Sequence, residues 1–126
     1  MIKTALIDIQ STLQELYKIH VPPLHVRIEN NSLFEVAGTK DAIQGKKKVN
    51  GFYFGSVIPK TKDIRFYYFP IYTHPNKFKW LSDELRKCQK GKSCFHFKQL
   101  SNELENEVKK MIQIGIEIYR YCKNTS

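Results

Sequence analysis

The residues best suited to metal chemistry are two cysteines and a histidine that lie close together in the sequence, Cys88, Cys94 and His96. Thiolate sulfur and imidazole nitrogen are the ligands that zinc and other soft metal ions prefer. Cys94 and His96 are two residues apart, so on a strand they share one face. The spacing matches no standard zinc finger. The alternative is that Cys88 belongs to the apolar stripe of a helix and Cys94 packs at an edge between layers.

Catalytic chemistry finds little support in the sequence. A nucleophilic cysteine needs a lowered pKa and a histidine oriented by an acid, and no such acid is visible beside Cys94 and His96. The adjacent carboxylates Asp83 and Glu84 follow Ser82 and are better explained as the start of a helix. The sequence contains no P-loop, no Rossmann glycine pattern and no His-Glu-x-x-His motif. We therefore expect a non-enzymatic protein without a cofactor.

Basic and aromatic residues are interleaved in the middle of the chain. Residues 40–100 hold 14 basic and 4 acidic side chains, which gives +10, whereas residues 1–39 give −1 and residues 101–126 give 0. The same middle segment holds 12 of the 16 aromatic residues. This pattern is typical of surfaces that bind single-stranded nucleic acid, and also of lysine-rich antiparallel sheets with an aromatic core.

Two strands carry many of these aromatic residues, and a short polar turn joins them. Gly51–Pro59 and Ile64–Ile71 are dense in β-branched and aromatic residues. The four-residue turn between them places Lys60 opposite Asp63 and so fixes the register. The predicted pairs are Phe52 with Ile71, Phe54 with Phe69, Gly55 with Tyr68, and Val57 with Phe66.

The two faces of this hairpin are expected to differ. We expect the face with Phe52 and Phe54 to be core, and the face around Gly55 to be only partly covered, because tyrosine rings pack while their hydroxyls stay in water. This second face is predicted to bind an anionic ligand, either single-stranded nucleic acid or a phosphorylated or carboxylated small molecule. The predicted ligand-binding residues are Tyr53, Phe66, Tyr68 and His96, rimmed by Lys62, Lys92 and Lys98.

Helices are predicted at both ends of the chain. Apolar residues recur every three or four positions from Ile2 to Leu16, and again from Leu104 to Cys122 after the N-cap Ser101. Shorter strands are predicted at residues 25–30, 33–38 and 93–98, and a broken helix between Pro75 and Gly91. Together these elements predict one α+β domain over residues 1–126, a two-layer α/β sandwich whose antiparallel sheet is flanked by N- and C-terminal helices.

Three segments resemble the YdhG-like family, a bacterial domain of unknown function. They are Gly51–Gly55, Phe69–Tyr72 and Lys90–Phe97, the last directly before the capped terminal helix. The resemblance covers nearly the whole chain and implies a frataxin-like fold. Some members are described as intracellular iron chaperones, so iron delivery is an alternative function. Iron handling of the frataxin type relies on an acidic ridge along the first helix, where this chain offers only Asp8 and Glu15.

The sequence also predicts the compartment. No uncharged stretch is longer than the eleven residues of Phe66–Asn76, which contain two prolines, whereas a membrane helix needs roughly 20 apolar residues. Asp8 interrupts the apolar residues near the N-terminus, which argues against a signal peptide. The odd count of three cysteines favours reduced thiols. We therefore expect a cytoplasmic protein without membrane contact, and a homodimer formed through the aromatic face is a third hypothesis.

Overall fold

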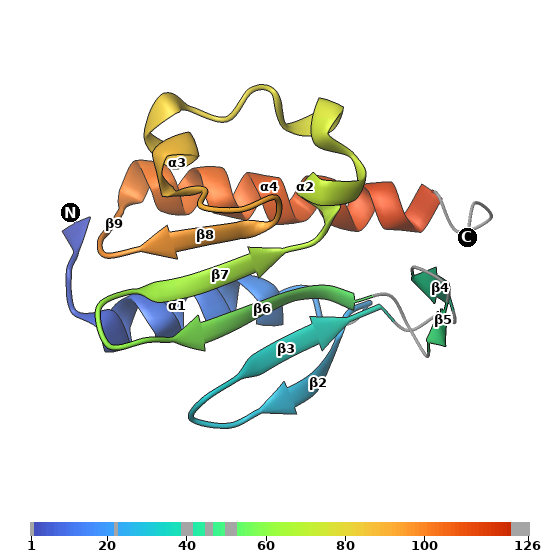
Figure 1. Cartoon of the computed structure of the whole chain (residues 1–126), viewed down its shortest axis with the longest axis horizontal. Coiled ribbons are helices and arrows are strands. Elements are labelled where there is room, and N and C mark those ends of the chain that lie inside the picture. The colour runs from blue at the N-terminus through green and yellow to red at the C-terminus, as the bar shows by residue number, and fades with distance from the viewer. Residues whose placement is uncertain (1, 22, 39–41, 45–46, 50–52, 122–126) are drawn as a thin grey trace.

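A five-stranded antiparallel sheet forms one layer of the structure and helices form the other (Figure 1). The computed structural model describes residues 2–21, 23–38, 42–44, 47–49 and 53–121. The architecture confirms the predicted α+β sandwich with an antiparallel sheet and helices near both ends. In spatial order the sheet consists of β2 (His25–Glu29), β3 (Phe34–Ala37), β6 (Tyr53–Pro59), β7 (Ile64–Tyr68) and β8 (Cys94–Phe97).

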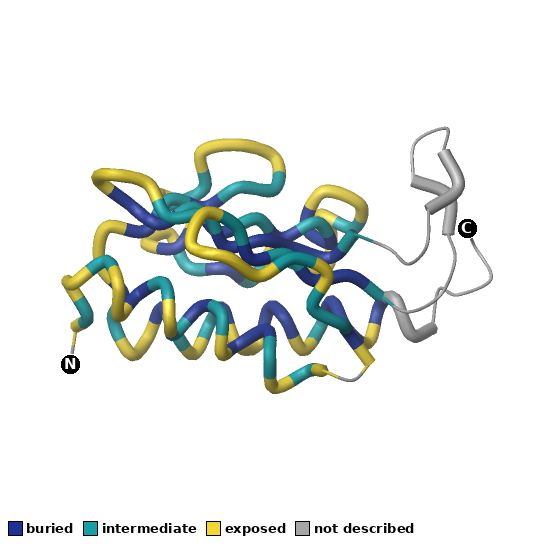
Figure 2. The backbone as a smooth tube through the Cα atoms, turned by 90° about the horizontal axis from the view of Figure 1, so that it is seen from below, coloured by how far each residue is buried: buried dark blue, intermediate teal, exposed yellow. Residues whose placement is uncertain are grey.

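The two long helices, α1 (Leu6–Lys18) and α4 (Asn102–Tyr121), lie on the same face of the sheet (Figure 1). Figure 2 shows that the buried residues gather between these two layers. Three short helices connect β7 to β8, and two small strand pairs complete the described elements. The short helices are α2 (Pro70–Thr73), η1 (Pro75–Phe78) and α3 (Asp83–Cys88), and the strand pairs are β1 (Ile2–Lys3) with β9 (Leu100–Ser101) and β4 (Ala42–Gln44) with β5 (Lys47–Val49).

Both predicted helix caps are confirmed. The Ser82 hydroxyl accepts a hydrogen bond of 3.1 Å from the Leu85 backbone N–H at the start of α3, and Ser101 accepts one of 3.1 Å from the Leu104 backbone N–H in α4. The predicted start of the first helix is wrong. Ile2 pairs with Ser101 in β1, and α1 begins only at Leu6. The apolar spacing includes Ile2 by coincidence, since its side chain is 53% exposed.

The predicted register of the β6–β7 hairpin is confirmed. The Lys60 backbone N–H donates to the Asp63 carbonyl over 2.9 Å, Gly55 pairs with Tyr68, and Val57 pairs with Phe66. The predicted second strand is too long, because Pro70 begins α2 directly after the turn at Phe69. The predicted pairing of Phe52 with Ile71 lies outside the described residues, as do the beginning of the first strand at Gly51 and the end of the last apolar stripe at Cys122.

Phe54 is in the core as expected, but the assignment of the face around Gly55 is wrong, because Phe66 and Tyr68 are fully buried as well. The pairing between β3 and β6 shifts by one residue, since Val36 pairs with Gly55 whereas Ala37 pairs with Tyr53. This bulge turns Phe54 to the same face as Gly55, and that face is the core, facing α1 and α4. Simple alternation along β6 would separate these two residues.

Candidate ligand-binding surface

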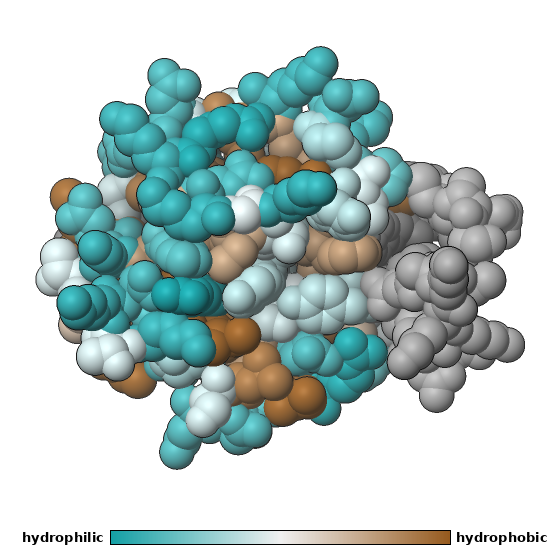
Figure 3. Space-filling view, viewed as in Figure 1, coloured by the Kyte–Doolittle hydropathy of each residue, from teal (hydrophilic) through white to brown (hydrophobic). Residues whose placement is uncertain are grey.

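The face of the sheet opposite α1 and α4 is directed toward the viewer in Figure 1. Cross-strand pairs place Glu35, Ser56, Tyr67 and Cys94 in one row across four strands. Figure 3 shows that hydrophilic groups predominate on this side, with more apolar residues between them. We call this surface the open sheet face and define it by Arg27, Glu35, Tyr53, Ser56, Arg65, Tyr67, Cys94 and His96.

Three aromatic rings are in contact where the open sheet face meets α2. The rings of Tyr53 and Phe69 are 5.8 Å apart between centroids, and those of Phe69 and Tyr72 are 5.6 Å apart. The Lys92 ammonium lies 5.7 Å from the centroid of Tyr72, within the range of a cation–π contact. Tyr72 is 51% exposed, so a ligand can reach its ring. We call Tyr53, Phe69, Tyr72 and Lys92 the aromatic corner.

Ion pairs compensate the charges on the open sheet face itself. Arg27 Nε lies 2.6 Å from Glu35 Oε2, and Arg65 Nε lies 3.3 Å from Asp63 Oδ1. His96 Nδ1 lies 3.6 Å from Asp63 Oδ2, so the acid beside His96 that the sequence did not reveal comes from the β6–β7 turn. Each carboxylate thus has a basic partner, and the surface between the ends of the strands carries little net charge.

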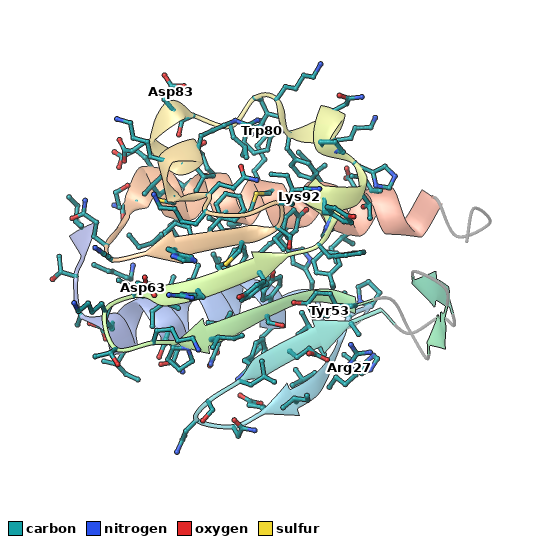
Figure 4. The ribbon with its side chains drawn as sticks, in the orientation of Figure 1. Arg27, Tyr53, Asp63, Trp80, Asp83 and Lys92 are labelled. Carbon is teal, nitrogen blue, oxygen red and sulfur yellow. The ribbon has the colours of Figure 1, made fainter. Side chains whose placement is uncertain are left out.

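Uncompensated positive charge lies at the ends of the strands. Lys62, Lys92 and Lys98 are exposed, and none forms an ion pair with another residue that the structure describes. Figure 4 shows Lys92 and Tyr53 toward one end of the sheet and Asp63 at the opposite end. Lys62 adjoins Asp63, and Lys98 follows the last residue of β8, which pairs with the first residue of β7. The predicted lysine rim is therefore divided between two ends.

The hydroxyl and thiol groups of this face are neutral donors at physiological pH. The Tyr53 hydroxyl forms a hydrogen bond of 2.8 Å with Ser56 Oγ, and burial raises the pKa of Tyr53 to about 12. Burial and a hydrogen bond to Cys94 raise the pKa of Tyr67. Burial also raises the pKa of the Cys94 thiol, and the opposing effects of Tyr67 and Arg65 are smaller. Cys94 is thus the opposite of an activated nucleophile.

The proposed soft-metal trio of Cys88, Cys94 and His96 is not supported. In the described part of the chain, no group of three His, Cys, Asp or Glu side chains could hold a metal ion. Cys88 lies in α3, where its thiol lies 3.6 Å from the Glu84 carbonyl and its side chain packs against the core. The alternative interpretation, in which Cys88 belongs to a helix stripe, is the correct one.

Two of the predicted ligand-binding residues are in the core. Phe66 and Tyr68 are fully buried, and the ring of Tyr17 from α1 stacks on Phe66 at 5.1 Å. The Tyr17 hydroxyl donates to the Tyr67 carbonyl over 2.6 Å and passes directly over Gly55. Gly55 therefore makes room for the side chain of Tyr17 and not for a ligand. Two other predicted residues, Tyr53 and His96, lie on the open sheet face as expected.

Sequence reasoning missed Tyr67 on the open sheet face, and Phe69 and Tyr72 in the aromatic corner. Residues 66–69 are four consecutive aromatic side chains, so alternation between apolar and polar residues gives no sign of which face is buried. One signal was available, since Arg65 and Tyr67 share a face by their spacing of two, and an arginine seldom points into a core.

Comparison with known proteins identifies no relative of this chain. No family model matches the chain, and neither curated proteins nor solved structures gave a significant match. The resemblance to the YdhG-like family and the frataxin-like fold therefore stay predictions. Among the described residues, no helix combines the length and apolar character that crossing a bilayer requires.

Proposed function

We propose that this protein binds single-stranded nucleic acid on the open sheet face, without catalysing a reaction. Bases stack on the rings of the aromatic corner, and the exposed lysines at the ends of the strands neutralise phosphates. The observation that carries this proposal is the series of contacting rings from Tyr53 through Phe69 to Tyr72, which ends under the ammonium group of Lys92. Aromatic rings on which bases can stack, placed beside cations, are the elements that sequence-tolerant single-strand binding uses.

An extended strand suits this surface better than a small metabolite does. The aromatic corner lies toward one end of the sheet, whereas Lys62 and Lys98 lie toward the other, so the ligand groups are spread along the sheet. Small-molecule sites instead converge polar groups on a concave, largely apolar cavity. A duplex is also a poor ligand, because its bases are already stacked on each other and cannot reach the ring of Tyr72.

Binding is supported over catalysis by the state of the reactive groups. The raised pKa of Cys94 keeps its thiol protonated, and the acid beside His96 is shared with the Arg65 guanidinium. A cysteine nucleophile requires the thiolate form. The neutral hydroxyls of Tyr53 and Tyr67 are suited to hydrogen bonding instead.

Fluorescence anisotropy with labelled single-stranded DNA and RNA of about 12 nucleotides tests the proposal. Tyr72→Ala removes the most exposed ring of the aromatic corner, and we expect binding to weaken by about 1–3 kcal/mol, or roughly 5- to 150-fold. Ile7→Ala is the matched control, because Ile7 is 66% exposed on α1, on the other side of the molecule. The proposal is contradicted if wild-type protein at micromolar concentration gives no salt-sensitive binding.

The salt dependence of binding gives a second test of the same proposal. Lys92→Gln removes one phosphate contact, so the slope of log affinity against log salt concentration should fall by about 0.7 for a single strand. Lys109→Gln makes the same charge change on α4, behind the sheet, and should leave the slope unchanged. Equal slopes for both variants would show that the basic excess acts diffusely and that Lys92 makes no contact.

Iron delivery and dimerisation through the aromatic face remain predictions from the sequence. Calorimetric titration with ferrous iron under anaerobic conditions tests the first, and sedimentation at two protein concentrations tests the second. Near α1, Glu105 is paired with Lys3 and Glu29 is paired with Lys18 of the helix itself. No observation on the described residues favours either role over strand binding.

A further inference from the structure

We infer that a strand bound to the open sheet face turns its bases toward the central row, Glu35, Ser56, Tyr67 and Cys94, and contacts the protein through phosphates only at the two ends of the strands. This inference rests on the proposed function and concerns how the ligand lies. It follows from the division of the face into a charge-compensated centre and two lysine-bearing ends.

The two ends are far enough apart for a strand to extend between them. Lys92 lies in the aromatic corner at one end of the sheet. Lys62 and Lys98 both lie at the other end, where β7 begins and β8 ends. At about 3.3 Å per residue, the five residues of β7 span about 17 Å. A ligand that contacts both ends therefore has to cross the row of side chains between them.

The central row disfavours a phosphate. The Glu35 carboxylate belongs to this row and is only 18% exposed, with Arg27 Nε at 2.6 Å. A phosphate above this pair would be repelled by the carboxylate and attracted by the guanidinium, so the two effects largely cancel. It would also lose its hydration, whereas the lysines at the ends offer positive charge that remains in water.

The same row suits the flat, uncharged surface of a base. The partly exposed rings of Tyr67 and the neighbouring Tyr53 offer apolar area and carry hydroxyl groups, whereas Ser56 is only 3% exposed and forms a hydrogen bond with the Tyr53 hydroxyl. Bases can stack on aromatic rings and exchange hydrogen bonds with such hydroxyls. Both the charge and the shape of the central row therefore favour bases over phosphates at this position.

Cys94 provides a reporter at this position, since it pairs with Tyr67 in the central row and is partly exposed. The test uses full-length protein with Cys88→Ser and Cys122→Ser. Two single-stranded oligonucleotides of equal sequence carry the same activated disulfide, tethered to a base in one and to a phosphate in the other. At alkaline pH, which compensates for the raised pKa of the thiol, we expect the base-tethered probe to form the mixed disulfide at least fivefold faster. Cys94→Ser in this background should abolish the reaction.

The outcomes separate the inference from the function on which it rests. If the phosphate-tethered probe reacts as fast or faster while anisotropy shows binding, the inference is wrong and the proposed function stands. If neither oligonucleotide binds in the anisotropy assay, the proposed function itself fails.

A salt series gives an independent reading that does not depend on thiol chemistry. The double variant Lys62→Gln/Lys98→Gln should lower the salt slope by about 1.4, twice the value for one phosphate contact. A double variant with Glu35→Gln and Arg27→Gln, which removes both charges of the central pair, should leave the slope unchanged. The reverse result, in which only the central variant changes the slope, would place phosphates over the centre and overturn the inference.

Discussion

Gly55 and Gly115 lie where the sheet and the helices approach closely, with no room for an added Cβ. An added Cβ at Gly55 would lie 2.5 Å from the Tyr67 carbonyl oxygen and 2.6 Å from Tyr17 Cζ. At Gly115 in α4 it would lie 3.0 Å from Phe54 Cζ and closer still to the Tyr68 hydroxyl. These approaches let the two tyrosine hydroxyls reach backbone carbonyls across the interface, so each buried hydroxyl is satisfied.

Gly55→Ala should therefore destabilise the protein by about 1–3 kcal/mol, because the methyl group displaces the Tyr17 hydroxyl and leaves it buried without its acceptor. Urea unfolding followed by circular dichroism measures this effect as a shift in the midpoint. Gly91→Ala is the control, since an added Cβ there would meet only Cys94 Cβ at 3.8 Å, an ordinary contact. Similar midpoints for the two variants would show that β6 and α1 can separate at little cost.

The residues of the candidate site were only partly predictable from the sequence. The position of His96 followed from alternation with two phenylalanines, and the structure keeps it on the open sheet face. The positions of Phe66 and Tyr68 could not be decided in this way, because every residue from 66 to 69 is aromatic. The missing information was tertiary, namely that Tyr17 on α1 inserts over Gly55.

At the scale of elements, α3 is tied to α4 through its own N-cap. The Ser82 hydroxyl accepts from the Leu85 backbone N–H and donates to Glu107 Oε2 over 2.7 Å, while the Ser82 backbone N–H donates to Glu107 Oε1 over 2.9 Å. By contrast, among the described residues the side chain of Ser101 forms a hydrogen bond only within its own helix, where its hydroxyl accepts from the Leu104 backbone N–H. One serine therefore both begins a helix and joins two helices.

Ser82→Ala should consequently cost more than Ser101→Ala. We expect about 1 kcal/mol for loss of the simple cap, and about 2 kcal/mol where the Glu107 carboxylate also loses a donor. The free energies of unfolding of the two variants, measured in urea, give this difference directly. If Ser101→Ala is the more damaging change, the contact between Ser82 and Glu107 adds nothing to stability.

Elements were predicted well where local chemistry determines them. The caps at Ser82 and Ser101 and the four-residue β6–β7 turn are signals within one short segment, and all three are confirmed. The bulge that brings Gly55 to the same buried face as Phe54 was not predictable, because it depends on pairing between β6 and the distant strand β3. The prediction that Ile2 belongs to the first helix is wrong for the same reason, since its strand partner Ser101 is about a hundred residues away.

At the scale of the whole molecule, the net charge of +9 is unevenly distributed in space as well as in sequence. The middle segment, with its excess of +10, supplies β6, β7, β8 and their connections, whereas α1 and α4 come from segments that are nearly neutral. The basic excess therefore belongs to the sheet strands and the segments that connect them, and not to the two long helices. Under the proposed function, this basic excess would attract a polyanion during encounter, and the attraction would weaken as salt increases.

The tyrosines also determine how the whole fold responds to alkaline pH. Burial raises the pKa of Tyr17 well above its ordinary value of 10.0, raises that of Tyr53 to about 12, and raises that of Tyr67 as well. Below pH 10 both the folded and the unfolded chain keep these protons. Between pH 10 and about pH 12 the unfolded chain loses a proton from Tyr53 that the folded chain retains, so stability should fall as the pH rises.

Urea unfolding from about pH 8 to about pH 11.5 tests this dependence. Each tyrosine that ionises only after unfolding contributes up to about 1.4 kcal/mol of lost stability per pH unit. Tyr53→Phe should therefore show a shallower decline than the wild type, even though it loses the hydrogen bond to Ser56 at every pH. Ile7→Ala, which changes only the outer side of α1, should keep the wild-type slope. A Tyr53→Phe slope equal to that of the wild type would mean that the Tyr53 hydroxyl is in water and that the open sheet face is looser than its hydrogen bonds indicate.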